Sequence, residues 1–220
     1  IVAGMGSNDT HAVVEQSRTF DLSGTVAILS VVPYYNKPSQ EGVYRHFMAV
    51  AEASPVPVII YNVPGRTGLN MTAQTTLRLA RATDKIVAIK EACGNIEQMQ
   101  QILDGRPDNF LVLSGDDGLT VELIKRGGDG VISVAANVFP EKFCRCVHNA
   151  MEGHVENAES EMRDMEEPIN LLFKEGNPVG AKAMASLMGL TRSEVRLPLV
   201  EATESLSAEI KTAIKKYELR

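Results

Sequence analysis

The sequence lacks any apolar run that approaches the roughly 18 residues of a membrane-spanning helix. It also lacks clusters of basic residues: 22 lysines and arginines stand against 28 aspartates and glutamates, for a net charge of -6. These absences exclude a helical membrane protein and argue against nucleic acid or an anionic membrane surface as a partner.

Cysteine and histidine are both scarce. The three cysteines, Cys93, Cys144 and Cys146, are an odd number without a C-x-x-C pair, so neither a disulfide framework nor a zinc site is expected. A reducing cytoplasm fits this cysteine usage. The four histidines are dispersed and none follows a predicted strand, so we expect neither a bound metal ion nor a metal cofactor.

Short aliphatic runs alternate regularly with segments of helical periodicity, a pattern that predicts parallel strands joined by helical crossovers. The runs are apolar throughout, as expected for strands covered by helices. The predicted strands are Ile1–Ala3, Val26–Val32, Val58–Tyr61, Ile86–Lys90, Phe110–Ser114 and Gly130–Val134. The predicted helices between them are Thr10–Phe20, Ser39–Ala53, Thr72–Ala82, Ile96–Leu103 and Leu119–Arg126.

After the last strand the pattern becomes helical only, with helices predicted over Pro140–Met151, Val155–Phe173, Ala181–Leu187 and Ser205–Tyr217. We therefore predict an α/β portion over residues 1–152 and a C-terminal helical region over 153–220.

Six parallel strands fit either an open doubly wound sheet or most of a TIM (β/α)8 barrel. The open sheet would need a G-x-G-x-x-G turn, but "GMGSND" has Asp9 at the third glycine position. A barrel predicts reactive residues at the C-terminal ends of several strands. The sequence shows that pattern, so we predict a barrel with six β/α units in this chain.

The residues at those strand ends include groups capable of covalent chemistry. Lys90 ends the fourth run, Tyr61 ends the third and Arg66 follows it, while Tyr34 and Tyr35 follow the second. A lysine at the end of an apolar strand loses hydration, which lowers its pKa and lets its neutral amine attack a carbonyl. A tyrosine phenol can shuttle the protons of imine formation, and an arginine fork suits a substrate carboxylate.

Each of these residues also has a structural interpretation. Lys90 alone would more often form a strand-end ion pair, with Glu91 as the nearest partner, and Arg66 alone would be a solvated loop residue. Tyr61 could be a core phenol, and Tyr34 and Tyr35 could be interface aromatics. The catalytic interpretation depends on their coincidence at the ends of one set of strands.

Five motifs together resemble the dihydrodipicolinate synthase family of pyruvate-dependent class I aldolases, over effectively the whole chain. They are "PYYNKPSQEG", "IIYNVPGRTG", "IKEACGN", "LSGDD" and "GVISVAANV", in family order.

The resemblance implies a role for each matching residue. Lys90 matches the lysine that forms a Schiff base with pyruvate, and Tyr61 matches the catalytic tyrosine. Tyr35 matches a relay tyrosine that family members insert into a neighbouring subunit's active site. Arg66 matches the residue that holds the aldehyde's carboxylate. Ile132 matches a residue of the pyruvate pocket, and Gly115 of the "LSGDD" motif is expected among the substrate-binding residues.

The implied reaction condenses pyruvate with aspartate 4-semialdehyde on the way to diaminopimelate and lysine. It uses no cofactor beyond the lysine–pyruvate imine, and the protein is expected to be a homodimer or homotetramer. N-acetylneuraminate lyase and keto-sugar-acid aldolases share the lysine and tyrosine, but Arg66 favours a small carboxylated aldehyde. An inactive paralogue acting as a binding subunit is a third reading.

Two departures from the family pattern lead to further expectations. Family barrels carry two more strand–helix units before the "IVAGMGSN" strand, with a threonine that bridges the two tyrosines. Residues 1–220 by themselves are therefore expected to leave two unpaired sheet edges and to lack turnover. A lysine-effector site is expected near Asn8 and Tyr34, but Ala12 stands where sensitive members have a glutamate. With His11 beside it as the one candidate substitute, lysine inhibition is expected to be weak or absent.

Overall fold

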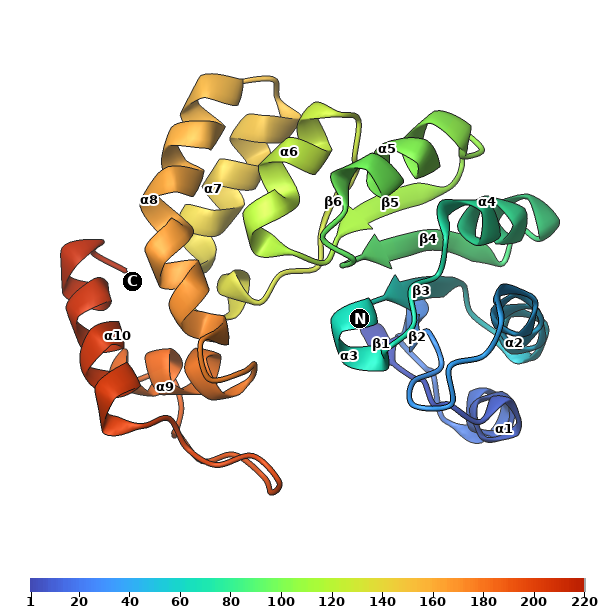
Figure 1. The fold of residues 1–220 in the computed structure, drawn as a ribbon, viewed down its shortest axis with the longest axis horizontal. Helices are drawn as coiled ribbons and strands as arrows, with labels where there is room; N and C mark the ends of the chain where they lie inside the picture. The colour runs from blue at the N-terminus through green and yellow to red at the C-terminus, as the bar shows by residue number, and fades with distance from the viewer. Residues whose placement is uncertain (220) are drawn as a thin grey trace. The chain divides into compact units, whose positions relative to one another are not determined.

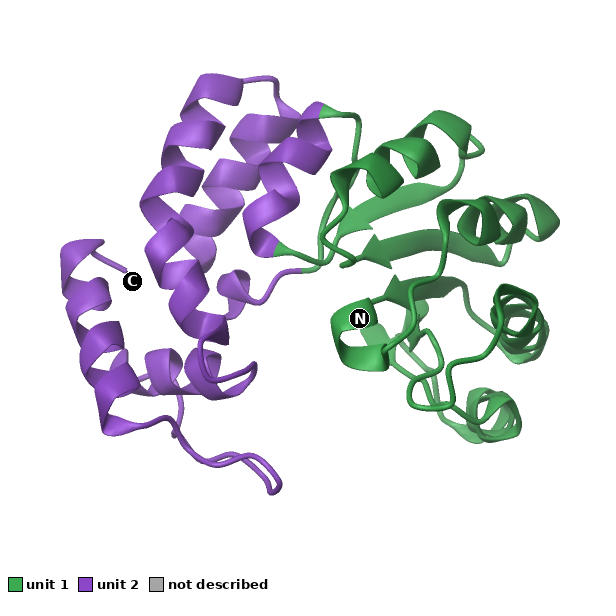
Figure 2. Ribbon diagram, viewed as in Figure 1, with its two compact units in different colours: residues 1–116, 126–132 green, residues 117–125, 133–220 purple. Residues whose placement is uncertain are grey.

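The computed structural model describes residues 1–219 and divides into two compact units (Figure 2). Unit 1 comprises residues 1–116 and 126–132, and unit 2 comprises residues 117–125 and 133–220. The predicted division into 1–152 and 153–220 follows the change from alternating to helical sequence rather than these contacts, and it stays a prediction.

Unit 1 contains a six-stranded, wholly parallel sheet whose strands follow one another in chain order. A doubly wound sheet reverses its strand order at a switch point, whereas a barrel wall does not. The sequential order therefore excludes the open doubly wound alternative. The strands are β1 (Val2–Gly4), β2 (Ala27–Val31), β3 (Val58–Asn62), β4 (Ile86–Glu91), β5 (Leu111–Ser114) and β6 (Gly130–Val131).

The crossover helices of unit 1 lie on one side of this sheet, which curls away from them (Figure 1). α1 packs against α2, α2 against α4 and α4 against α5. The first turns of α1, α2, α4 and α5 are each closed by a polar side chain; Ser39, for example, accepts a hydrogen bond from the Gly42 N–H at the start of α2. The helices are α1 (Thr10–Thr19), α2 (Gln40–Ala53), α3 (Pro64–Thr67), α4 (Ala73–Ala82) and α5 (Ile96–Gly105).

Unit 2 is helical, with α8 packed against α6, α7, α9 and α10. Gly180 allows α9 to approach α8 closely, because a Cβ at this position would lie 2.4 Å from the carbonyl oxygen of Leu171. The helices are α6 (Thr120–Lys125), α7 (Pro140–Met151), α8 (Val155–Phe173), α9 (Val179–Leu187) and α10 (Glu204–Lys216), with short 3-10 turns η1 (Asp117–Leu119) and η2 (Ala135–Asn137). None of the helices within residues 1–219 has the length and apolar character that crossing a membrane requires.

Three differences from the sequence-based prediction bear on the strand ends. β4 continues through Glu91, so Lys90 is the penultimate strand residue, and Arg66 lies in the short helix α3 rather than on a loop. β6 ends at Val131 instead of Val134, because the N–H groups of Val134 and Ala135 donate to the Asp117 carboxylate and begin η2.

Candidate active site

Lys90 and Tyr61 are neighbours across β3 and β4 at the carboxyl ends of the strands. The Lys90 Nζ lies 4.4 Å from the centre of the Tyr61 ring, and the lysine is only 9% exposed. Parallel register puts paired residues on the same face of the sheet, so both side chains project from the concave face. The arrangement places a largely desolvated amine beside a phenol.

The Tyr61 phenol remains protonated at neutral pH. Burial raises its pKa, and the positive charge of Arg66 opposes this shift. A neutral phenol can donate a proton to a developing alkoxide and take it back. Arg66 lies in α3, directly after β3, and is exposed.

Gly115 provides the space that the Lys90 side chain occupies. A Cβ at Gly115 would lie 2.7 Å from the Ala92 Cβ and 3.1 Å from the Lys90 Cγ and Cε. The Gly115 N–H donates to the Glu91 carbonyl at 2.8 Å, and the Ile132 N–H donates to the Ser114 carbonyl at 2.9 Å. The backbones at both predicted substrate-binding positions are thus tied to the ends of β4 and β5.

Tyr35 lies on a tight turn and is 87% exposed. Its φ of 71° is left-handed, and the Asn36 N–H donates to the Tyr34 carbonyl across it at 2.8 Å. The Asn36 side chain donates to the Asn8 carbonyl at 2.9 Å, so the predicted effector residues Asn8 and Tyr34 belong to the same loop cluster. The structure therefore presents the Tyr35 side chain to solvent.

Sequence reasoning missed a buried polar cluster behind Lys90 and Tyr61. Asn62 and Glu91 follow those two residues and are both 0% exposed. Asn62 donates to both carboxylate oxygens of Glu91, at 2.9 and 3.0 Å. Consecutive strand residues face opposite sides of a sheet, so this carboxylate lies on the other face from the Lys90 amine. The available signal was a polar residue directly after each of the two reactive ones.

Burial shifts the pKa values of Cys93 and His46 in unit 1. Burial, reinforced by the charge of Glu91, raises the pKa of Cys93 to about 12. Burial lowers the pKa of His46 to about 4, and its ring nitrogen Nδ1 lies 2.9 Å from the Thr10 hydroxyl. Within residues 1–219 no three histidine, cysteine or acidic side chains are grouped to hold a metal ion.

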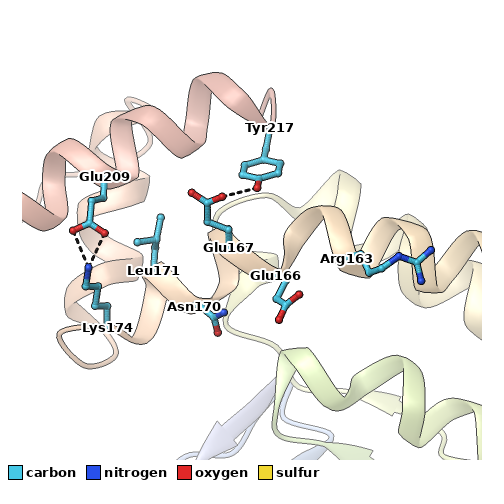
Figure 3. Close-up of a pocket in the computed structure, with 8 residues that line it drawn as sticks. All are labelled: Arg163, Glu166, Glu167, Asn170, Leu171, Lys174, Glu209 and Tyr217. Carbon is cyan, nitrogen blue, oxygen red and sulfur yellow. Dashed lines mark hydrogen bonds and ion pairs between the residues drawn. The ribbon is translucent and has the colours of Figure 1, made fainter.

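A hollow of about 520 Å³ lies between α8 and α10 of unit 2 (Figure 3). Two of the acidic side chains that line it are engaged in ion pairs and hydrogen bonds: Glu167 with Lys216 and Tyr217, and Glu209 with Lys174. These contacts join α10 to α8, and we assign them to helix packing.

Comparison with known proteins gives consistent matches over the whole chain. The model of the dihydrodipicolinate synthetase family matches residues 1–217. A curated 4-hydroxy-tetrahydrodipicolinate synthase of Parabacteroides distasonis is 48% identical over 220 residues, which are all of this chain and 74% of that protein.

Two solved structures are similar in fold and sequence. The dihydrodipicolinate synthase of Acinetobacter baumannii complexed with pyruvate has a TM-score of 0.95 and 37% identity, covering 100% of this chain and 75% of that one. The enzyme of Cyanidioschyzon merolae with lysine bound has a TM-score of 0.95 and 39% identity, covering 100% and 74%.

Proposed function

We propose, from the premise that the chain belongs to the dihydrodipicolinate synthetase family, that it condenses pyruvate with aspartate 4-semialdehyde to give 4-hydroxy-tetrahydrodipicolinate. The observation that carries this proposal is the placement of Lys90, a residue only 9% exposed, with its Nζ 4.4 Å from the Tyr61 ring centre. The name of the Parabacteroides relative supports this reaction over a sugar-acid aldolase or an inactive subunit.

The chemistry begins at the Lys90 nitrogen. Its lone pair attacks the keto carbon of pyruvate, and the Tyr61 phenol passes a proton to the carbinolamine oxygen, which leaves as water. Loss of a methyl proton from the imine gives an enamine, whose carbon attacks the aldehyde. Cyclisation with the substrate's own amino group then releases the product and frees Lys90. This sequence uses no metal or organic cofactor.

The remaining predicted site residues have supporting roles in this proposal. Gly115 and Ile132 bring backbone close to the pyruvate, and Arg66 binds the aldehyde's carboxylate. Tyr35 completes the proton relay of a second subunit, which its 87% exposure supports, so a homodimer or homotetramer is part of the proposal. The six strands correspondingly form part of an eight-stranded barrel. Cytoplasmic location, the effector site at Asn8 and Tyr34, and weak lysine inhibition stay predictions; an inhibition titration with lysine tests the last.

The test is borohydride trapping of the imine in the protein as the cell makes it. Pyruvate with borohydride is expected to leave a reduced adduct on Lys90, located by mass spectrometry of peptides. The variant Lys90→Ala should lose the adduct and the turnover, whereas Lys85→Ala, at the opposite end of β4, should keep both. Labelling that persists in Lys90→Ala would contradict the proposal.

A coupled assay then identifies the second substrate. Turnover with aspartate 4-semialdehyde is expected, and cleavage of N-acetylneuraminate is not. The reverse pattern would assign the chain to the sugar-acid aldolases.

A further inference from the structure

The buried residues directly after Tyr61 and Lys90 are both polar. Asn62 and Glu91 are partners in the register of β3 and β4, one position beyond the Tyr61–Lys90 pair. Both are 0% exposed. Ile60 and Ile89, which lie two positions earlier on the same face of these strands, are apolar. A polar pair thus replaces the apolar core at the level of the candidate active site.

The Glu91 carboxylate is surrounded by neutral hydrogen-bond donors. Besides Asn62, the Gln98 side chain donates to Glu91 Oε2 at 3.1 Å, and the Cys93 N–H donates to Oε1 at 2.9 Å. Asn62 is itself held in place, because its Oδ1 accepts from the Met71 N–H at 3.0 Å. These bonds join β3, β4 and α5, and we call Asn62, Glu91 and Gln98 the polar clamp.

The polar clamp is costly as a stabilising device. Burial of a carboxylate among neutral groups carries a desolvation penalty, and burial raises the pKa of Glu91 accordingly. Apolar residues of similar size often stabilise a core as well or better. What the clamp adds is geometry: two bonds from one amide to both oxygens of one carboxylate define the separation of the two strand ends.

That separation also sets the placement of the reacting groups. Asn62 and Glu91 are bonded neighbours of Tyr61 and Lys90, about 3.8 Å away along each backbone. A misplacement of roughly 1 Å in such a site can lower a rate about a hundredfold.

We propose that Glu91, held by Asn62 and Gln98, is a positioning residue that fixes the ends of β3 and β4 so that the Lys90 amine lies over the Tyr61 ring. The inference rests on the proposed function, because it assigns Lys90 the nucleophilic role. Glu91 acts through Lys90 and does not itself contact the substrate.

The test swaps the hydrogen-bond donor and the acceptor of the Asn62–Glu91 pair. Glu91→Gln places an amide N–H2 group against the Asn62 donor, and Asn62→Asp opposes two carboxylates. The double variant restores one acceptor and one donor. Each single variant is expected to slow imine trapping at Lys90 at least about tenfold, and the double variant to recover to within about threefold of wild type.

Asp129→Asn is the matched control. Asp129 is another carboxylate of unit 1, partly buried rather than fully buried: it pairs with Arg106 and accepts from the Val112 N–H at 2.7 Å, near the start of β5. This variant is expected to lower the melting temperature while the trapping rate stays within about twofold of wild type. Should Glu91→Gln fail to fold, Gln98→Met removes a single donor and is expected to slow trapping several-fold.

Three results would overturn the inference. One is a wild-type trapping rate in Glu91→Gln. Another is a double variant that regains the melting temperature but not the rate. The third is an Asp129→Asn variant that slows trapping as much as Glu91→Gln does.

A crystallographic measurement separates this inference from the proposed function. If wild-type protein forms no pyruvate adduct, the proposed function fails, but the distance from Lys90 Nζ to the Tyr61 ring centre can still be measured. It is 4.4 Å here and is expected to increase by about 1 Å or more in Glu91→Gln. An unchanged distance would overturn the positioning role.

Discussion

Lys90 and Glu91 have different surroundings because consecutive residues of a β-strand face opposite sides of the sheet. Lys90 faces the concave side of the sheet beside Tyr61, and Glu91 faces the helices beside Asn62. The residue types in the sequence indicate the Lys90–Tyr61 pair. They do not indicate the Asn62–Glu91 pair, because a glutamate after a lysine equally suggests an ion pair, and only the pleat places the two side chains on opposite faces.

Gly115 gives a prediction at this scale. Gly115→Ala is expected to destabilise the protein by about 1–3 kcal/mol, since its Cβ would overlap Ala92. It should also push the Lys90 stem aside and slow imine trapping by about tenfold or more. Chemical denaturation and trapping kinetics measure the two effects.

Gly4→Ala serves as the control for this variant, because nothing lies within 4 Å of a Cβ at Gly4 in β1. It should leave the trapping rate unchanged. A Gly115→Ala variant that reacts as fast as wild type would show that the close contact to Lys90 is without consequence.

At the scale of elements, the loop between β2 and α2 is a strained turn held from two sides. The left-handed conformation of Tyr35 costs about 1–3 kcal/mol for a residue other than glycine. The bonds from Asn36 to the Asn8 carbonyl and from the Tyr35 N–H to the Thr67 carbonyl, at 2.9 and 3.3 Å, offset that cost. The loop thereby projects the Tyr35 side chain into solvent.

Removing one of these anchors is expected to affect activity more than stability. Asn36→Ala deletes a bond worth about 1 kcal/mol and should lower turnover roughly fivefold, because the turn that presents Tyr35 is less populated. The melting temperature should change little. Steady-state assays and thermal unfolding measure both.

Arg81→Ala removes a comparable exposed bond, from α4 to the Gly105 carbonyl at 2.7 Å, and should leave turnover unchanged. Equal turnover in Asn36→Ala and wild type would mean that the turn does not need this anchor.

At the scale of the whole molecule, the sequential parallel sheet ends in two edge strands, β1 and β6, each paired on one side. Ile1 and Val2, at the β1 edge, are 85% and 42% exposed. Such edges invite association with other chains, and a sheet of six strands does not close a barrel of the usual eight.

A polypeptide limited to residues 1–220 is therefore expected to lack pyruvate turnover and to associate in solution. Light scattering and the coupled assay check the two expectations. The protein as the cell makes it is the comparison. Full turnover by residues 1–220 alone would contradict the argument.

The sequence by itself determined the alternation of strands and helices, the six strands, and the placement of Lys90 and Tyr61 near the carboxyl ends of two of them. It could do so because apolar runs and residue chemistry are local properties. It missed α3, whose four residues are too few for a periodic signal, and it extended β6 because an apolar run does not show where pairing stops. Only the tertiary structure decided that Asn62, Glu91 and Gln98 meet behind the reactive pair, because those contacts join residues up to 29 positions apart through strand register and the packing of a helix.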